Sequence, residues 1–159
     1  MDDTTRAIIE RIVERYDAPR QLPNCDHESK IFFDCQKLTP NDLARLAAEA
    51  TGHLPDEAFD VAVGVAYKGI FFSAAIAGGR QIAILKTDGK IHGPDLNGKR
   101  VLVVIDVLCL GREAKRAVSQ VTQMGAQVVG MACIIDRSNG KLDNELGPIY
   151  SAHQLPLDI

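Results

Sequence analysis

Short apolar runs alternate along the chain with longer stretches in which apolar residues recur every three or four positions. Runs such as residues 101–105 predict strands buried on both faces, as in a parallel sheet. Stretches such as residues 112–124 predict amphipathic helices that cover a sheet. The expected strands are residues 30–35, 60–64, 81–85, 101–105, 128–135 and 149–152, and the expected helices are residues 4–16, 39–51, 69–77 and 112–124. This order predicts a single-domain α/β fold, a mostly parallel sheet flanked by helices with right-handed crossovers.

Local residues mark where some of these elements begin and end. Thr39 is a helix cap, Pro40 suits the first turn, and Asp42 completes a capping-box-like pattern. Gly125 stands where the helix over residues 112–124 would end. Residues 86–99 are polar and hold three glycines and one proline, which predicts a mobile loop or a hairpin.

Composition narrows the class of protein. A chain of 159 residues with 46% hydrophobic and 25% charged residues is expected to fold as one domain. The net charge of −3 gives no electrostatic case for nucleic acid, and no apolar stretch reaches the ~20 residues of a membrane span. The four cysteines have neither CxxC nor zinc spacing, and Cys35 and Cys133 are expected to be buried thiols. A reduced cytoplasm is the simplest setting.

The segment 101–124 has the layout of an anion site. A buried strand ends at Asp106, Gly111 forms a turn, and a helix follows, so backbone N–H groups and the positive helix end converge on one point. Small hydroxyl residues are missing from this turn, and Glu113 adds a carboxylate that could cost a nearby phosphate up to ~4 kcal/mol. Glu113 also suits a first helical turn, and Arg112 would offset it by pairing with Glu113 or by reaching the phosphate.

Two segments together resemble the type I phosphoribosyltransferases, and among them the orotate enzymes. The first is this strand, turn and helix, and the second is residues 64–70, Gly-Val-Ala-Tyr-Lys-Gly-Ile, which is similar to the family's pyrophosphate loop. Residues 29–34, 86–93 and 134–137 resemble the family's aromatic segment, basic flexible loop and Asp-Arg segment in the family's order.

The resemblance implies transfer of ribose 5-phosphate from phosphoribosyl pyrophosphate to a nucleobase through an oxocarbenium-like transition state. It also implies Mg²⁺ held largely by the substrate's oxygens with no direct protein ligand, a small phosphorylated substrate as partner, and a homodimer whose lids act across subunits. It divides the chain into an N-terminal hood part (residues 1–55), small or reduced, and a core (residues 56–159).

The resemblance also assigns roles to individual residues. Lys90, His92 and Asp106 are the candidate catalytic residues. The candidate pyrophosphate-binding residues are Ala66, Tyr67, Lys68, Gly69 and Lys86. The candidate 5-phosphate loop is Cys109, Leu110, Gly111, Arg112 and Glu113. The candidate base-binding residues are Phe32, Phe33 and Arg137.

The chain departs from the family pattern at several of these places. Ile105 replaces the first of two adjacent acids that hold the ribose hydroxyls, a loss worth ~1.5–3 kcal/mol. Asn24 stands where a substrate-contacting lysine is expected, and Asp26 and Glu28 add negative charge there. Leu85 and Lys86 stand where the family has an Arg-Lys pair, so Leu85 replaces the arginine.

Each assignment has a plainer alternative. In this alternative, Lys68 is a solvated surface residue, and so are the basic residues of the segment 86–92. Asp106 is then an acidic residue in a turn, and Phe32 and Phe33 are core residues. Arg137 would form a local surface ion pair with Asp136. Cys109, close to a helix start, would either have a lowered pKa and be redox-sensitive or be a plain buried thiol. For the whole chain, the alternatives are a catalytically inactive homologue that binds a nucleotide, phosphate or pyrophosphate in a regulatory role, and an unrelated α/β domain.

Overall fold

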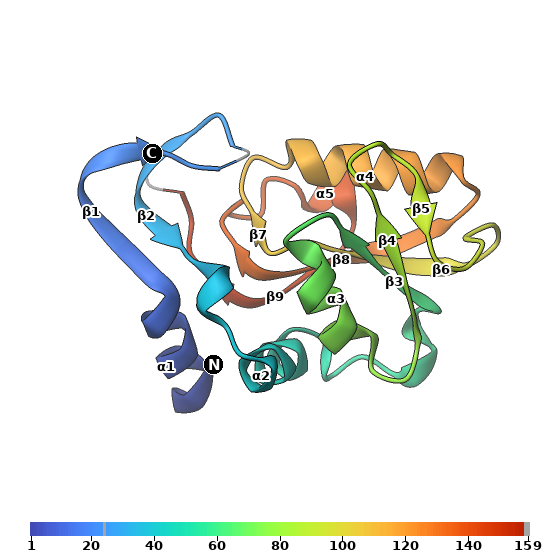
Figure 1. Ribbon diagram of the computed structural model, residues 1–159, viewed down its shortest axis with the longest axis horizontal. Coiled ribbons are helices and arrows are strands. Elements are labelled where there is room, and N and C mark those ends of the chain that lie inside the picture. The colour runs from blue at the N-terminus through green and yellow to red at the C-terminus, as the bar shows by residue number, and fades with distance from the viewer. Residues whose placement is uncertain (24, 158–159) are drawn as a thin grey trace.

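A seven-stranded, mostly parallel sheet forms the body of the protein, seen in a computed structural model that describes residues 1–23 and 25–157 (Figure 1). The strands are hydrogen-bonded in the order β5-β4-β3-β6-β8, with β9 on the far side of β8. Their bounds are β3 Val61–Val65, β4 Gln81–Leu85, β5 Ile91–His92, β6 Arg100–Val104, β7 Val107–Leu108, β8 Gln127–Asp136 and β9 Ile149–Gln154. Both β6 and β7 pair with β8 in parallel, so β7 continues the line of β6 beyond Ile105 and Asp106.

Helices cover both faces of this sheet. One face packs against α1 (Asp3–Ile12), α2 (Pro40–Thr51) and α3 (Gly69–Ala77), and the other against α4 (Arg112–Gln123) and α5 (Asp143–Leu146). The strands alternate between the two cores: Ala62 belongs to the first, while Val61 and Val63 belong to the second. Burial on both faces explains why these strands are almost wholly apolar.

A two-stranded antiparallel ribbon stands beside the body, at the left of Figure 1. It consists of β1 (Val13–Gln21) and β2 (Glu28–Phe33), and short 3₁₀ helices follow at Cys35–Lys37 and Asp56–Ala58. Arg137, at the end of β8, joins the ribbon to the body. Its guanidinium donates to the Ile31 carbonyl at 2.9 Å, to the Ser29 hydroxyl at 3.2 Å and to the Leu155 carbonyl at 3.2 Å.

The predicted elements of the body are confirmed, most within one or two residues. Helix α3 and strand β4 have the predicted bounds, and the 86–99 segment forms a hairpin in which β5 pairs with β4. The α2 capping box is present: Thr39 Oγ1 accepts from the Asp42 N–H at 3.2 Å, and Asp42 Oδ2 accepts from the Thr39 N–H at 2.8 Å. The α/β fold class is therefore correct.

The N-terminal prediction is partly wrong. The helix expected over residues 4–16 ends at Ile12, because Val13 is extended and begins the pairing of β1 with β2. Strand β7 and helix α5 were not predicted. The division into a hood and a core stays a prediction, although α2, from the N-terminal part, packs in the core of the body.

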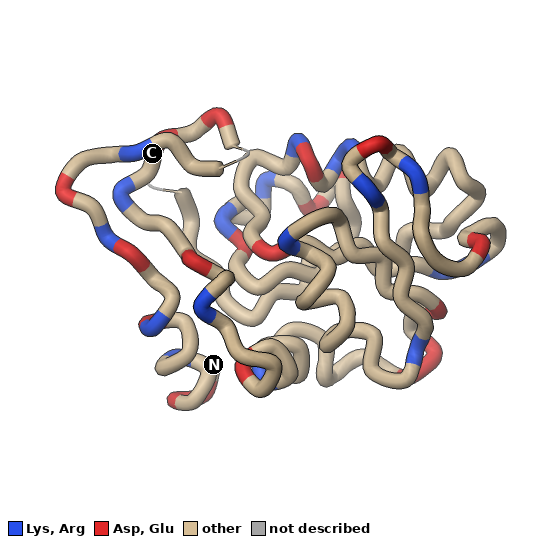
Figure 2. Tube along the Cα trace, viewed as in Figure 1, with Lys and Arg blue, Asp and Glu red and all other residues tan. Residues whose placement is uncertain are grey.

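Charge is mixed over the molecule. Figure 2 shows Lys and Arg interspersed with Asp and Glu on the face that it presents, in keeping with the net charge of −3. Within the described residues, no helix is both long and apolar enough to cross a membrane.

Candidate functional site

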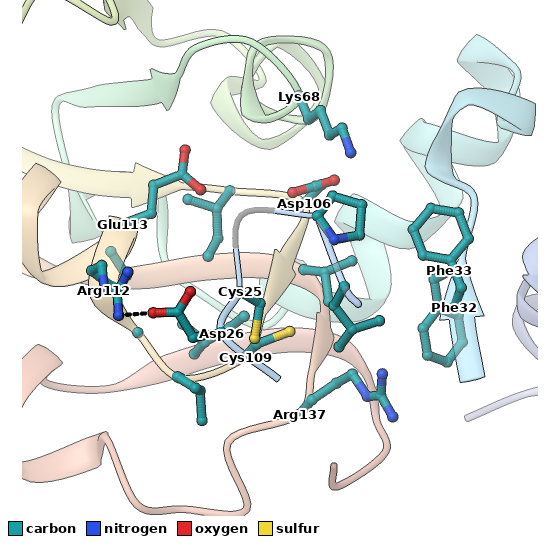
Figure 3. A pocket seen from close by; sticks show the side chains of 18 residues that line it. Cys25, Asp26, Phe32, Phe33, Lys68, Asp106, Cys109, Arg112, Glu113 and Arg137 are labelled. Atoms are coloured by element: carbon teal, nitrogen blue, oxygen red, sulfur yellow. Dashed lines mark hydrogen bonds and ion pairs between the residues drawn. The ribbon is translucent and has the colours of Figure 1, made fainter. Parts of the chain in front are cut away.

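A cleft opens where β3 and β6 end, and Lys68 and Asp106 lie at its centre (Figure 3). Three adjoining hollows share these two side chains. The hollow on the Phe32 and Phe33 side is mainly apolar and has a volume of about 480 Å³, within the range of small-molecule sites. We call the whole depression the central cleft.

The turn from β3 to α3 places Lys68 in the central cleft. A Cβ added to Gly69 would lie 2.4 Å from the Val104 carbonyl oxygen, so only glycine lets α3 begin this close to β6. The Ala66 N–H donates to the Leu85 carbonyl at 2.9 Å, and the Ala66–Tyr67 peptide bond is cis. Tyr67 itself is 74% exposed at the rim.

Lys68 and Asp106 point into the same part of the cleft (Figure 3). Among the residues that the structure describes, Lys68 has neither an ion pair nor a side-chain hydrogen bond. Burial raises the pKa of Asp106, while the backbone N–H of Val107 and the charge of Lys68 act in the opposite direction. A half-buried acid beside an unpaired cation in a cleft is typical of a functional site.

The turn from β6 to α4 forms the opposite side of the cleft. Gly111 has a left-handed φ of +85°, and no side chain among the described residues caps the first N–H groups of α4. Arg112 forms an ion pair with Asp26, which lies in the segment between β1 and β2. The alternative in which Arg112 pairs with Glu113 is therefore wrong. Glu113 instead extends into the cleft on the side away from Arg112 (Figure 3).

Glu113 is half-buried and electrostatically linked to its surroundings. Burial raises the pKa of its carboxyl, and the charge of Asp106 raises it further, while Arg116 and Lys68 lower it. Within the described part of the chain, Glu113 has no hydrogen-bond or ion-pair partner.

Of the two alternatives for Cys109, a lowered pKa is not supported. Burial is the largest cause of a pKa raised to about 12, and the neighbouring Cys25 raises it as well. The two sulfurs lie side by side in Figure 3, and both thiols are free. Cys109 is thus the plain thiol of the two alternatives. Cys133, in β8, is buried as expected, whereas Cys35, also expected to be buried, is only half-buried.

Arg137 and the two phenylalanines lie on the ribbon side of the cleft. The alternative of a surface ion pair between Arg137 and Asp136 is wrong: Arg137 is only 2% exposed, and Asp136 accepts from the Ser138 N–H and hydroxyl. Phe32 and Phe33 line the cleft, and Phe33, 4% exposed, also belongs to the core. A base-binding role for these residues stays a prediction.

The β4–β5 hairpin does not bring its cations into the cleft. The Lys86 N–H donates to the Lys90 carbonyl at 2.9 Å, and the Lys86 ammonium lies 3.9 Å from Asp88. Neither lysine nor His92 lines the cleft among the described residues, although Thr87 does. Their catalytic and pyrophosphate-binding roles stay predictions.

Sequence reasoning missed part of the cleft wall. Leu22, Pro23 and Cys25 line it, as does Arg116, one helical turn beyond Arg112. Because residues one helical turn apart lie on the same face of a helix, the spacing of Arg112 and Arg116 could have predicted that Arg116 lines the cleft. Asn24, where a lysine was expected, lies outside the described residues.

Comparison with known proteins decides the family. No family model matches the chain. An orotate phosphoribosyltransferase of Methanospirillum hungatei is 32% identical over 144 residues, which cover 80% of this chain and 83% of that protein. The chain belongs to the orotate phosphoribosyltransferase family. Another member, from Streptomyces avermitilis, is 29% identical over 157 residues and matched over 86% of its length, whereas one from Chlorobium phaeobacteroides is matched over 64%.

Solved structures agree with this family in fold. The orotate phosphoribosyltransferase from Aeropyrum pernix superposes with a TM-score of 0.77 at 20% identity and covers 94% of this chain and 93% of that one. The Mycobacterium tuberculosis enzyme in complex with inorganic phosphate gives 0.72 at 24% identity, with coverage of 96% and 94%. The type I phosphoribosyltransferase fold is thus confirmed, and the alternative of an unrelated α/β domain is wrong.

Proposed function

We propose that this protein transfers ribose 5-phosphate from phosphoribosyl pyrophosphate to a ring nitrogen of an orotate-type pyrimidine base and releases pyrophosphate. The observation that carries the proposal is that Lys68, which has no partner among the described residues, and the half-buried Asp106 lie together at the centre of the cleft. These two residues match the family's pyrophosphate loop and ribose-binding acid.

Each part of the cleft has a task in this reaction. The Lys68 ammonium would neutralise the charge that develops on the leaving pyrophosphate. Asp106 would accept a hydrogen bond from a ribose hydroxyl and favour the positive charge of an oxocarbenium-like transition state. The uncapped first turn of α4 would donate backbone N–H groups to the 5-phosphate. The apolar hollow beside Phe32 and Phe33 has the size and lining for a planar base.

Magnesium belongs to this proposal as part of the donor substrate. No group of three or more His, Cys, Asp or Glu side chains among the described residues could hold a metal ion. The residues present therefore fit an ion carried by pyrophosphate oxygens and waters rather than one held in a protein cage. When bound, Mg²⁺ would neutralise part of the pyrophosphate charge.

The proposal includes a homodimer in the cytoplasm. Because Lys86, Lys90 and His92 do not line the cleft of their own chain, we assign them to the cleft of the partner subunit. The four free cysteines support a reducing compartment.

The alternative of a catalytically inactive homologue receives no support from the relatives, which are named as orotate phosphoribosyltransferases. One solved relative, from Mycobacterium tuberculosis, is described in complex with phosphoribosyl pyrophosphate itself and is 28% identical, with a TM-score of 0.62 over 73% of each chain.

Calorimetric titration with phosphoribosyl pyrophosphate, with and without Mg²⁺, tests the donor site. We expect Mg²⁺-dependent binding, followed by consumption of orotate and release of pyrophosphate when the base is added. Absence of binding at millimolar donor would overturn the proposal. Binding with no turnover of orotate would restrict it to a different base, which a panel of pyrimidines and purines would identify.

A further inference from the structure

Glu113 occupies an unusual position in the central cleft. It is the second residue of α4, and its neighbour Arg112 forms an ion pair with Asp26. Glu113 itself extends into the hollow that holds Asp106 and Lys68 (Figure 3). The first turn of α4 therefore pairs its cation with Asp26 at the cleft wall and leaves its carboxylate in the cleft without a partner among the described residues.

This position costs the protein energy. The carboxylate is half-buried, lies in the field of the like-charged Asp106, and has no partner among the described residues. Burying charge without a partner is unfavourable, so such groups in a cleft indicate a ligand that satisfies them. If helix-dipole stabilisation were its whole role, a fully exposed Glu113 would serve equally well.

The chemistry of the cleft restricts what this ligand group is. Two carboxylates that face one space repel phosphate, but they accept hydrogen bonds from two hydroxyls. A ribose ring carries two neighbouring hydroxyls. Ile105, at the position of the first family acid, is 4% exposed and packs in the core on the α4 face, so it supplies no acceptor.

We infer that Glu113 is the second ribose-binding carboxylate, acting with Asp106 from a different element of the fold and replacing the acid absent at Ile105. The inference rests on the proposed function, since it concerns the ribose of the same donor. It makes Glu113 a determinant of sugar specificity, whereas the family pattern places a phosphate-binding residue at that position.

Binding of ribose 5-phosphate, compared with its 2-deoxy and 3-deoxy forms, tests this inference without base or pyrophosphate. The wild type is expected to prefer ribose 5-phosphate over at least one deoxy form by roughly tenfold or more. Glu113→Gln is expected to weaken binding of ribose 5-phosphate roughly ten- to a hundredfold and to abolish that preference. Glu113→Asp, which keeps a carboxylate, is expected to bind ribose 5-phosphate with an affinity between those of the wild type and Glu113→Gln.

Glu145→Gln is the matched control, because Glu145 pairs with Lys115 outside the cleft. It is expected to bind all three sugars as the wild type does. Urea unfolding of each variant checks that the fold is intact.

The outcomes separate the two claims. If Glu113→Gln binds ribose 5-phosphate more tightly, Glu113 only repels the phosphate, and the inference is wrong while the proposed function stands. Unchanged affinity with the sugar preference retained has the same meaning. If the wild type neither binds ribose 5-phosphate nor transfers it from the pyrophosphate donor, the proposed function fails together with the inference.

Discussion

The two strand-to-helix turns that face each other across the cleft are built in opposite ways. The β3–α3 turn is short, begins its helix at a glycine pressed against β6, and presents an unpaired cation. The β6–α4 turn is longer, passes through the short strand β7, pairs its cation with Asp26, and presents a carboxylate. The side chains of the first turn thus suit a pyrophosphate, while the carboxylate of the second suits hydroxyl groups beside the backbone N–H groups proposed for the 5-phosphate. A donor with a pyrophosphate at one end of a sugar matches that division.

Removing the cation of the first turn is expected to have the largest effect. Lys68→Ala should lower kcat/KM roughly ten- to a hundredfold, because a charge-assisted contact to the leaving group is worth ~1.5–3 kcal/mol. Lys141→Ala, which removes an exposed lysine outside the cleft, is the control. Steady-state rates of pyrophosphate release measure both. Equal rates in the two variants would show that the turns do not differ in function.

The close approach that sets up the first turn is the next point to test. Gly69→Ala would place a methyl group 2.4 Å from the Val104 carbonyl oxygen. We expect it to lower the free energy of unfolding by ~1–3 kcal/mol, as overpacking does, and to displace Lys68. Gly79→Ala, where a Cβ meets no atom within 4 Å, is the control. Urea denaturation compares them, and an unchanged midpoint for Gly69→Ala would contradict the argument.

In the second turn, the Glu113 carboxylate is expected to destabilise the folded protein at neutral pH. Because the pKa of Glu113 is raised in the folded state, the native protein binds more protons than the unfolded chain as pH rises from the ordinary value of 4.5. Stability from this group is therefore highest in acid and falls through that window. Asp106, Lys68 and Arg116, the charged groups that face Glu113, are present both in the wild type and in a variant that changes Glu113 alone.

Glu113→Gln should therefore raise Tm at pH 7, where each kcal/mol recovered corresponds to roughly 2–4 °C. The gain should disappear near pH 4, where the wild-type carboxyl is protonated. Differential scanning calorimetry at the two pH values measures it. A lower Tm for the variant at pH 7 would mean that Glu113 has a stabilising partner in solution.

The smallest effect is expected at the exposed ion pair between Arg112 and Asp26 on the cleft wall. Asp26→Asn removes the partner of Arg112, but both side chains are largely exposed, so the free energy of unfolding should change by less than ~1 kcal/mol. Freed from Asp26, Arg112 should strengthen binding of inorganic phosphate a few-fold at low salt, with less effect at high salt. Titrations at two ionic strengths test this, and weaker phosphate binding would contradict it.

The sequence predicted the body well because its strands and helices have strong and different periods. Strand β1 was missed for a physical reason: residues 13–21 are largely polar, include Pro19, and become a strand only through pairing with β2. The preceding helical period continues through Val13, so nothing local marks the change.

The cleft was predictable where position along a strand decides it. Lys68 and Asp106 lie just after the ends of the neighbouring parallel strands β3 and β6, whereas the sequence could not tell which way Glu113 points. The partner of Arg112 was not predictable, because Asp26 is 86 residues away in the chain. The burial of Arg137 was missed for the same reason: Asp-Arg after a strand has the composition of a surface turn until the ribbon packs over it.

The contact between Arg137 and the ribbon also sets an order of assembly during synthesis. The Ile31 carbonyl leaves the ribosome 106 residues before the guanidinium that binds it. At ordinary rates of translation that interval is roughly 5–20 s. For all of that time the ribbon lacks this contact, so the hydrogen bond that ties β2 to the end of β8 can form only after β8 has been made.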